Sequence, residues 1–254
     1  MMRWALGVEY DGTHFCGWQQ QPGLKTVQGE LESALSNVAD DTIELICGGR
    51  TDAGVHAAGQ VVHFDTPVRR SARAWALGAN AHLSRQLSVA WAVPVADFFH
   101  ARFSAQRRHY RYTFFNRATR SALHAATSTW VAMPLNVQAM QAGAQHLIGE
   151  HDFSAFRAAE CQSRSPIRRV DSLVVRREGP LVYFDIAANA FLHHMVRNIA
   201  GLLMAVGRGD REAHEVATLL TSRDRRLNAP TAPAEGLCLR RIDYPSAFAL
   251  PDPV

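Results

Sequence analysis

The sequence predicts an α+β fold made of two halves, residues 1–105 and 106–254, that repeat one β-α-β-β-α-β order of elements. Short segments in which apolar and other residues alternate indicate strands. Between them lie longer segments whose apolar residues recur every three or four positions, as in helices. Both patterns occur in the same order twice. No low-complexity segment separates the halves, so we expect their sheets to join.

The first half opens on a strand, because Trp4, Leu6, Val8 and Tyr10 alternate with other residues. A helix is expected to begin at Thr26, since the apolar residues that follow it share one helical face. The elements predicted after these are strands at 42–47 and about 60–65, joined by the loop 48–54, a helix from Ser71 to about Ala81, and a strand at 87–93.

The second half repeats this order, with one additional short helix. Residues 116–135 hold no convincing periodic pattern and are expected to connect a strand to a helix. The tail, Pro245 to Val254, carries three prolines and is expected to be either loose or laid along the surface. The predicted elements are a strand at 109–115, a helix from Asn136 to near Gly149, a hairpin of strands at 167–176 and 181–187, helices at about 191–206 and 212–220, and a strand at 237–242.

Length and composition indicate an ordinary globular protein of 254 residues, with 47% hydrophobic and 20% charged residues. No apolar run reaches the ~18 residues that a membrane-spanning helix needs. The first residues lack the core of a signal peptide, so we expect a cytoplasmic protein. The four cysteines lie far apart in the sequence, which favours buried thiols over disulfides or zinc ligands.

The basic residues are almost all arginine, since Lys25 is the only lysine. Arginine binds phosphate bidentately and stacks on bases, which suits RNA, although a GC-rich genome would explain the same excess. Their distribution says more than their number. From Phe98 to Gly149 there is no acidic residue, whereas six arginines fall in that stretch, at 102, 107, 108, 111, 117 and 120. This pattern is typical of a surface that binds a polyanion.

The loop 48–54 places Arg50 and Asp52 two residues apart among three glycines, between two predicted strands. Glycine permits a tight turn and a close approach of the backbone to a ligand. On composition alone the segment fits an ordinary connecting turn equally well, with Arg50 paired to Asp52 on the surface.

The segment Arg50-Thr51-Asp52-Ala53-Gly54-Val55-His56-Ala57 resembles the active-site signature of the TruA family of tRNA pseudouridine synthases. The resemblance continues in order along nearly the whole chain. The other segments that carry it are Tyr10–Thr13, Phe15–Gln19, Thr26–Gln28, Ala101–Ala105, Arg108–Tyr112, Asp152–Phe156 and Phe191–Asn198.

The resemblance implies two ferredoxin-like halves joined into one extended mixed, mainly antiparallel sheet with helices on one face. The first half would carry the catalytic Asp loop, and the second the active-site tyrosine and an arginine on a helix. The implied reaction converts uridine to pseudouridine at positions 38, 39 and 40 of the tRNA anticodon stem-loop. The resemblance also implies a homodimer. The reaction changes no oxidation state, so no cofactor is expected.

Carried over from the family, Asp52 is the catalytic carboxylate that acts at ribose C1′. Tyr110 would stack on the target uracil, although from the residues alone it matches a core aromatic as well as Tyr112 does. Arg50 would hold the flipped nucleotide out of its stack. Arg197 would favour the charged form of Asp52.

Other residues are candidates for contacts with RNA rather than for chemistry. The candidate phosphate contacts are Arg102, Arg107, Arg108, Arg111, Arg168 and Arg169. His193 and His194 are expected to line the site or touch RNA. The histidines match no metal motif and pair with no cysteine at zinc-ligand spacing, so we expect no metal.

Two other functions fit part of the pattern. A noncatalytic module of tandem RNA-recognition-like domains has the same order of elements, but it would not need a carboxylate in a glycine-bounded loop. Hydrolysis of a glycosidic bond would need a second carboxylate as general acid, and none accompanies Asp52 in its motif.

Overall fold

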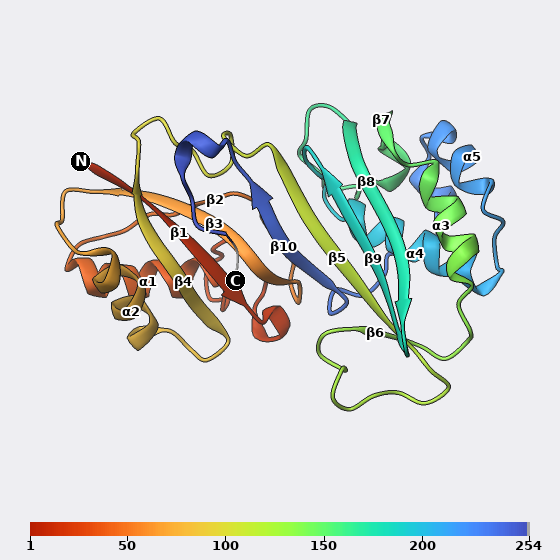
Figure 1. The fold of residues 1–254 in the computed structure, drawn as a ribbon, viewed down its shortest axis with the longest axis horizontal. Helices are drawn as coiled ribbons and strands as arrows, with labels where there is room; N and C mark the ends of the chain where they lie inside the picture. Colours follow the sequence, from red (N-terminus) through yellow and green to blue (C-terminus); the bar gives the residue numbers. More distant parts are fainter. Residues whose placement is uncertain (253–254) are drawn as a thin grey trace. The chain divides into compact units, whose positions relative to one another are not determined.

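A computed structural model describes residues 1–252 and divides the chain into two compact units (Figure 1). The first unit contains Met1–Arg108 together with the segment that begins at Cys238, and the second contains His109–Leu237. Within residues 1–252, no helix combines the length and the apolar character that crossing a membrane requires.

The first unit is built on a sheet in which β3 pairs antiparallel with β1 and β2, while β4 pairs with the other side of β1. Strand β10 pairs with β3 in the parallel direction, through Cys238 opposite His56. The elements of this unit are β1 (Met2–Tyr10), η1 (Gly12–His14), α1 (Val27–Ala39), β2 (Ile46–Cys47), β3 (His56–Thr66), α2 (Ala72–His82), β4 (Leu87–Val95), β10 (Leu237–Asp243) and η4 (Ser246–Phe248).

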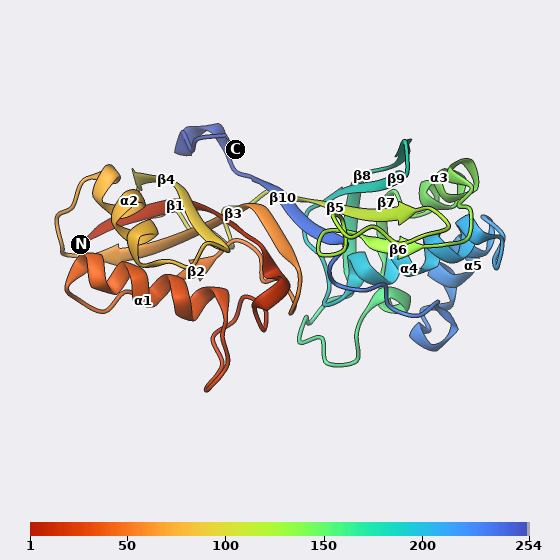
Figure 2. The ribbon, with the colours of Figure 1, turned by 90° about the horizontal axis from the view of Figure 1, so that it is seen from below.

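Helices α1 and α2 begin where the sequence predicts, because the side chains of Thr26 and Ser71 cap them. The Thr26 hydroxyl accepts a hydrogen bond from the Gly29 N–H at 3.3 Å, and the Ser71 hydroxyl accepts one from Ala74 at 3.1 Å. Both helices lie on one face of the sheet of the first unit (Figure 2).

The other face of this sheet is covered by the end of the chain (Figure 2). The Tyr244 hydroxyl donates a 2.6 Å hydrogen bond to the Ala101 carbonyl, and the Phe248 ring lies edge-on to Phe99 with centroids 5.0 Å apart. Leu250 packs against the same apolar cluster. Of the two states expected for the tail, the structure has the one laid on the surface as far as Leu250, because the tail buries aromatic and apolar side chains there. Residues 253 and 254 lie outside the described part.

Strand β2 is shorter than the predicted strand at 42–47. The N–H of Ile43 donates to the Ser36 hydroxyl at 3.0 Å, and the N–H of Leu45 donates to the Glu32 carboxylate at 2.8 Å. These donors are bound to side chains of α1, so residues 42–45 run extended beside the helix without joining a ladder of strands.

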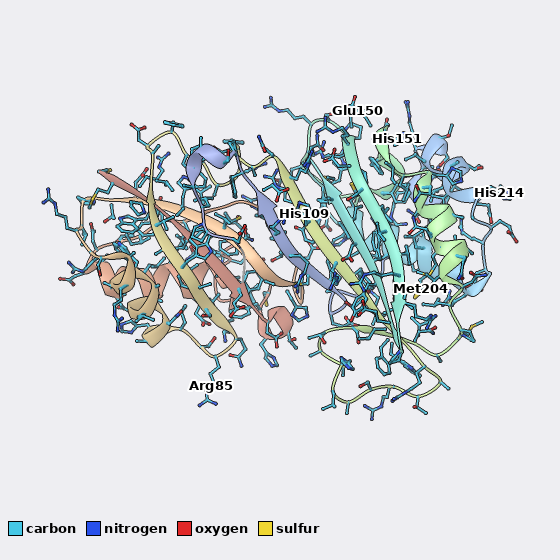
Figure 3. The ribbon with its side chains drawn as sticks, in the orientation of Figure 1. Arg85, His109, Glu150, His151, Met204 and His214 are labelled. Carbon is cyan, nitrogen blue, oxygen red and sulfur yellow. The ribbon has the colours of Figure 1, made fainter. Side chains whose placement is uncertain are left out.

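The second unit contains a sheet of order β5-β9-β8-β7, with β6 parallel to β5. Strand β6 falls in the stretch for which the sequence predicts only a connection, and β7, which carries Glu150 and His151 (Figure 3), is also not predicted. The elements are β5 (Arg107–Asn116), β6 (Thr129–Val131), α3 (Val137–Gln145), β7 (Gly149–Asp152), η2 (Ser154–Phe156), β8 (Ile167–Glu178), β9 (Leu181–Ala188), α4 (Met195–Arg208), α5 (Glu215–Ser222) and η3 (Arg225–Leu227).

The predicted α+β class is confirmed, with mixed, mainly antiparallel pairing of strands. Along the chain the second β-α-β-β-α-β series runs β5, α3, β8, β9, α4 and β10, with β6, β7 and α5 as additions. The predicted boundary after residue 105 lies three residues before the observed one. Strand β10, which is predicted to belong with residues 106–254, groups with the first unit, where it pairs with β3.

Helix α4 forms the core of the second unit and begins at Met195, four residues later than predicted. The residue before it, His194, has a left-handed backbone with φ of 60°, so the helix cannot start earlier. Gly201 lies where the segment around Pro230 crosses the helix. A Cβ atom at Gly201 would stand 2.1 Å from the Pro230 carbonyl oxygen, so only glycine permits this packing.

We expect Gly201→Ala to lower the free energy of unfolding by about 2 kcal/mol, because the new methyl group meets backbone that cannot move aside. In an ordinary helix interior the same change stabilises by about 1 kcal/mol. Gly29→Ala in α1 is the matched control, since the nearest atom there is the Thr26 hydroxyl oxygen at 3.1 Å. Urea denaturation of both variants measures the difference; a stabilised Gly201→Ala would contradict the observed packing.

Candidate catalytic loop and its counterpart on helix α4

The loop between β2 and β3 is attached to the rest of the first unit through its backbone. The carbonyl of Thr51 accepts a 3.0 Å hydrogen bond from the N–H of Trp18. The hydroxyl of Thr51 lies 2.8 Å from that of Tyr10, in a buried position at the end of β1. Both the backbone and the side chain of the residue before Asp52 are therefore fixed.

The buried side chain of Gln60 holds the other end of the loop. Its amide nitrogen donates to the Gly49 carbonyl at 2.5 Å, and its amide oxygen accepts from the Gly49 N–H at 3.2 Å. The turn itself is closed by the Val55 N–H, which donates to the Asp52 carbonyl at 3.1 Å. Gly54 adopts φ of 78° inside this turn, a conformation that favours glycine.

The segment between β1 and α1 forms a second loop, which packs so closely on the Asp52 loop that two of its residues must be glycine. A Cβ atom at Gly12 would lie 2.1 Å from the Val55 carbonyl oxygen. One at Gly17, where φ is 86°, would lie 2.9 Å from the Thr51 oxygen. This second loop is in turn tied to the start of α1, since the N–H of Val27 donates to the Gly17 carbonyl at 3.1 Å. The turn that carries Asp52 is thus held by neighbouring backbone.

Asp52 lies half-buried on this turn, while Arg50 two residues earlier is exposed. His56, at the start of β3, accepts a 3.0 Å hydrogen bond from the Gly12 N–H and lies 3.2 Å from the Asp11 carboxylate. Partial burial opposes ionisation of Asp11, but hydrogen bonds from the hydroxyl and the N–H of Thr13 hold its pKa below the usual value. The first unit therefore presents Asp52 on a rigid turn, with the exposed guanidinium of Arg50 two residues before it in the sequence.

The second unit supplies Tyr110, which lies on β5 and is 8% exposed. Its ring stands perpendicular to that of Phe191, with centroids 5.2 Å apart and an angle of 86° between the planes. This contact connects the middle of β5 to the segment that leads into α4. Tyr112, two residues along the same strand, is fully buried and its hydroxyl donates to the Pro233 carbonyl at 2.8 Å. Tyr110 is thus the more accessible of the two.

Arg197 is held on the first turn of α4 by a reciprocal contact. Its Nε donates to the Ala232 carbonyl at 2.9 Å, and the Ala232 N–H donates to the Arg197 carbonyl at 3.1 Å. The neighbouring Asn198 is fully buried. Its amide oxygen accepts from the Thr231 hydroxyl at 2.6 Å and from Arg225 at 3.0 Å. This network fixes the segment that Arg197 contacts, and no motif in the sequence predicts it.

His193 and His194 lie just before α4 with their ring centroids 4.0 Å apart. The N–H of His193 donates to the Cys161 sulfur at 3.4 Å, and its carbonyl accepts from the Ala158 N–H at 3.1 Å. Both residues therefore lie at the entry to the helix that carries Arg197. In residues 1–252, neither unit taken by itself brings together three His, Cys, Asp or Glu side chains that could hold one metal ion.

Several of the arginines predicted to contact phosphate have partners within the protein. Arg108 donates to the Gly48 carbonyl at 2.9 Å and to the Arg102 carbonyl at 2.7 Å, so it braces the start of the Asp52 loop. Arg111 forms a bidentate pair with Asp185, at 2.6 and 3.0 Å. Arg169 binds Asp171 at 2.9 Å. Arg102 and Arg107 are exposed, and Arg168 is half-buried.

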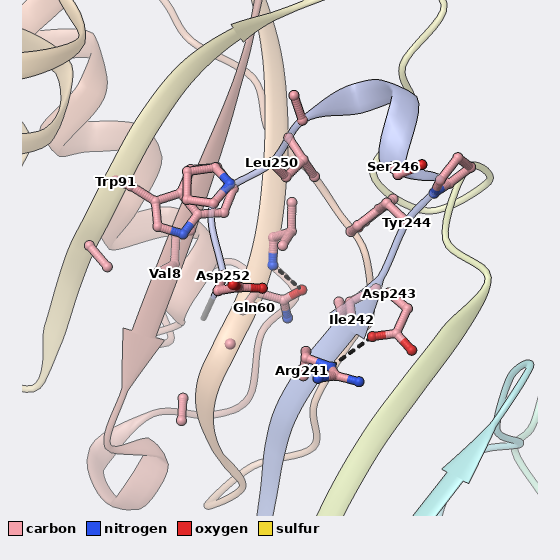
Figure 4. Close-up of a pocket in the computed structure, with 18 residues that line it drawn as sticks. Val8, Gln60, Trp91, Arg241, Ile242, Asp243, Tyr244, Ser246, Leu250 and Asp252 are labelled. Carbon is pink, nitrogen blue, oxygen red and sulfur yellow. Dashed lines mark hydrogen bonds and ion pairs between the residues drawn. The ribbon is translucent and has the colours of Figure 1, made fainter. Parts of the chain in front are cut away.

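A cavity of about 430 Å³ lies elsewhere in the first unit, on the face of the sheet that the chain end covers (Figure 4). Trp91 and Leu250 line it together with the ion pair of Arg241 and Asp243, 2.7 Å apart. None of the residues predicted to act in catalysis lines this cavity. The chemistry suggested by the Asp52 loop therefore does not depend on it.

Comparison with known proteins agrees with these features. A family model described as tRNA pseudouridine synthase matches residues 7–104 and 144–245. The tRNA pseudouridine synthase A of Methylococcus capsulatus is 56% identical over 249 residues, which cover 98% of this chain and 92% of that protein. The corresponding proteins of Vibrio cholerae and Nitrosococcus oceani are 53% and 52% identical, covering 99% and 98% of this chain and 95% and 96% of theirs.

The matched family segments include both the Asp52 loop and the start of α4, and the relatives cover almost the entire chain. The resemblance inferred from the motifs is therefore confirmed. The chain belongs to the TruA family of tRNA pseudouridine synthases, which are isomerases that act on tRNA.

Proposed function

We propose that this chain converts uridine to pseudouridine at positions 38, 39 and 40 of the tRNA anticodon stem-loop, with Asp52 as the nucleophile. The observation that carries the proposal is the fixed backbone on both sides of Asp52, through Thr51 and Gly49. A nucleophile held in this way needs little reorganisation to meet a bound nucleotide, which lowers the entropic cost of reaction.

The reaction moves the glycosidic bond of C1′ from one atom of the uracil, N1, to another, C5. An Asp52 oxygen forms a bond to ribose C1′ as the bond from C1′ to uracil N1 breaks, and N1 keeps the electron pair. The uracil then turns so that C5 faces C1′. C5 attacks C1′ and displaces the carboxylate, after which the proton on C5 is lost and N1 gains one. Asp52 is regenerated, and no oxidant or energy source is consumed.

The remaining site residues have roles in this scheme that their positions support. Arg50 is exposed beside Asp52 and can reach into RNA to hold the flipped nucleotide. Tyr110 would stack on the uracil and accept the C5 proton. Arg197, fixed by its contact with Ala232, would pair with the Asp52 carboxylate. We propose that the residues of the two units act on the same nucleotide.

A noncatalytic RNA-binding module, the alternative considered from the sequence, is not favoured, because the chain belongs to a family of isomerases. Such a module would also have no use for the hydrogen bonds that fix the Asp52 turn. Hydrolysis of the glycosidic bond would release free uracil, which serves as a marker for that outcome.

We expect wild-type protein, given unmodified tRNA without added cofactor or metal, to form pseudouridine at positions 38, 39 and 40. Asp52→Asn should reduce the rate at least about 1,000-fold, because the amide is a poor nucleophile at C1′. Binding of tRNA should be retained, since the turn is held by its backbone. Position-by-position mapping of pseudouridine and a filter-binding assay measure the two effects.

Asp40→Asn is the matched control, because Asp40 is an exposed residue at the end of α1 and the change removes the same charge. Its activity should equal that of wild type. Normal turnover by Asp52→Asn would remove Asp52 from the mechanism. Modification only at uridines outside the anticodon stem-loop would overturn the proposed substrate position.

We also propose that the chain acts as a homodimer in the cytoplasm. In a dimer one subunit can hold the body of the tRNA while the other presents its active site to the anticodon stem-loop. Trp130 and Met133 are about half exposed and line the same shallow hollow of the second unit, so apolar surface is available there.

Light scattering on the purified protein should give twice the chain mass of 28.1 kDa at concentrations where the enzyme is active. Diluting the protein until it dissociates should lower the activity per chain, because each tRNA would lose its second contact. A monomer with full activity per chain would contradict the dimer.

A further inference from the structure

The segment between η2 and β8, residues 157–166, is anchored directly beside the start of α4. Ala158 and His193 are joined through the 3.1 Å backbone hydrogen bond, and Cys161 accepts from the His193 N–H at 3.4 Å. The segment therefore lies next to the residues that lead into the Arg197 turn.

Two half-buried arginines, one at the start of this segment and one just after it, donate hydrogen bonds to it. Arg157 donates to the Cys161 carbonyl. Arg168, the second residue of β8, donates to the carbonyl of Ser165 at 3.0 Å and to the hydroxyl of Ser163 at 2.7 Å. All these acceptors are neutral. The Nε of Arg168 is shielded from solvent and has no hydrogen-bond partner among the described residues.

Neither guanidinium is paired with a carboxylate within residues 1–252. This distinguishes them from other arginines of the second unit: Arg169 binds Asp171 and Arg208 binds Asp210, each at 2.9 Å or less. Burial lowers the pKa of Arg168, the charge of Cys161 raises it, and the charge of Arg157 lowers it.

The thiol of Cys161 is an acidic group that interacts with both arginines. Although partial burial opposes its ionisation, N–H groups of Ser163 and His193 and the charge of Arg157 lower the pKa of Cys161. Even a complete thiolate would balance only one of the two positive charges. Glu160 is exposed and pairs with neither arginine among the described residues.

A half-buried pair of cations is costly unless an anion accompanies it. We propose that Arg157 and Arg168, together with the Ser163 hydroxyl, bind one phosphate oxyanion of the RNA backbone. Guanidinium groups match the oxygens of a phosphate, and the unpartnered Nε of Arg168 can become a donor after a small movement. The position beside His193 places this phosphate next to the Arg197 turn. The assignment of the anion to RNA rests on the proposed function.

The test compares tRNA binding across salt concentrations in the Asp52→Asn background, where substrate is not consumed. Arg157→Gln should weaken binding about 10-fold at low salt. It should also reduce the slope of log K against log salt concentration by about one, as loss of one phosphate contact predicts. Arg157→Lys keeps the charge without the planar fork and should restore most of the slope.

Arg208→Gln is the matched control, because Arg208 already has a carboxylate partner; its affinity and slope should stay unchanged. Inorganic phosphate provides a second arm that does not depend on RNA. It should raise the melting temperature of wild type more than that of Arg157→Gln. If it does so while the RNA slope is unchanged, the site takes free phosphate and its assignment to RNA is overturned.

If neither phosphate nor RNA distinguishes Arg157→Gln from wild type, the site itself is overturned. A reduced RNA slope in a protein that forms no pseudouridine would leave the phosphate site standing and defeat the proposed function instead. Unchanged melting of Arg157→Gln in the absence of phosphate establishes that the variant folds; if it does not melt like wild type, the phosphate titration of wild type alone decides.

Discussion

The position of Asp52 depends on hydrogen bonds made by the residues beside it. Trp18 and Tyr10 hold Thr51, and Gln60 holds Gly49, so the turn between them has little freedom. The side chain of Asp52 itself takes no part in these three contacts. The rigidity of the turn therefore does not depend on the carboxylate, which suits the role proposed for Asp52. It also requires glycine at Gly12 and Gly17, where any side chain would strike the turn.

Some arginines of this protein stabilise the fold, and others are proposed to bind RNA. The groups that accept their hydrogen bonds distinguish the two roles. Arg108 braces the Asp52 loop through carbonyl oxygens, and Arg111 forms a bidentate pair with Asp185. Arg157 and Arg168 have only neutral acceptors, and it is this lack of a carboxylate that marks them as a phosphate site. An excess of arginine in the composition therefore overstates the number of contacts available to RNA.

Elements with strong periodicity or a capping residue could be predicted from the sequence, as for β1 and for the helices that begin after Thr26 and Ser71. The predictions of strands were wrong where contacts with residues distant in the sequence determine whether a strand forms. β2 is short because α1 side chains bind its backbone donors, and β6 forms only because β5 offers a partner. The Asp52 loop was recognised by its motif. Arg157 could not be recognised from the sequence, because only the folded structure shows that no carboxylate among the described residues pairs with it.

The central claim is that Asp52 meets the ribose of an extruded uridine. A crystal structure of Asp52→Asn with an unmodified anticodon stem-loop tests this most directly, because binding can then be observed without turnover. The account predicts one flipped uridine with its C1′ within about 3.5 Å of the side chain at position 52. A bound stem-loop whose target C1′ lies well beyond contact with that side chain, with the uridine flipped against other residues, would contradict it.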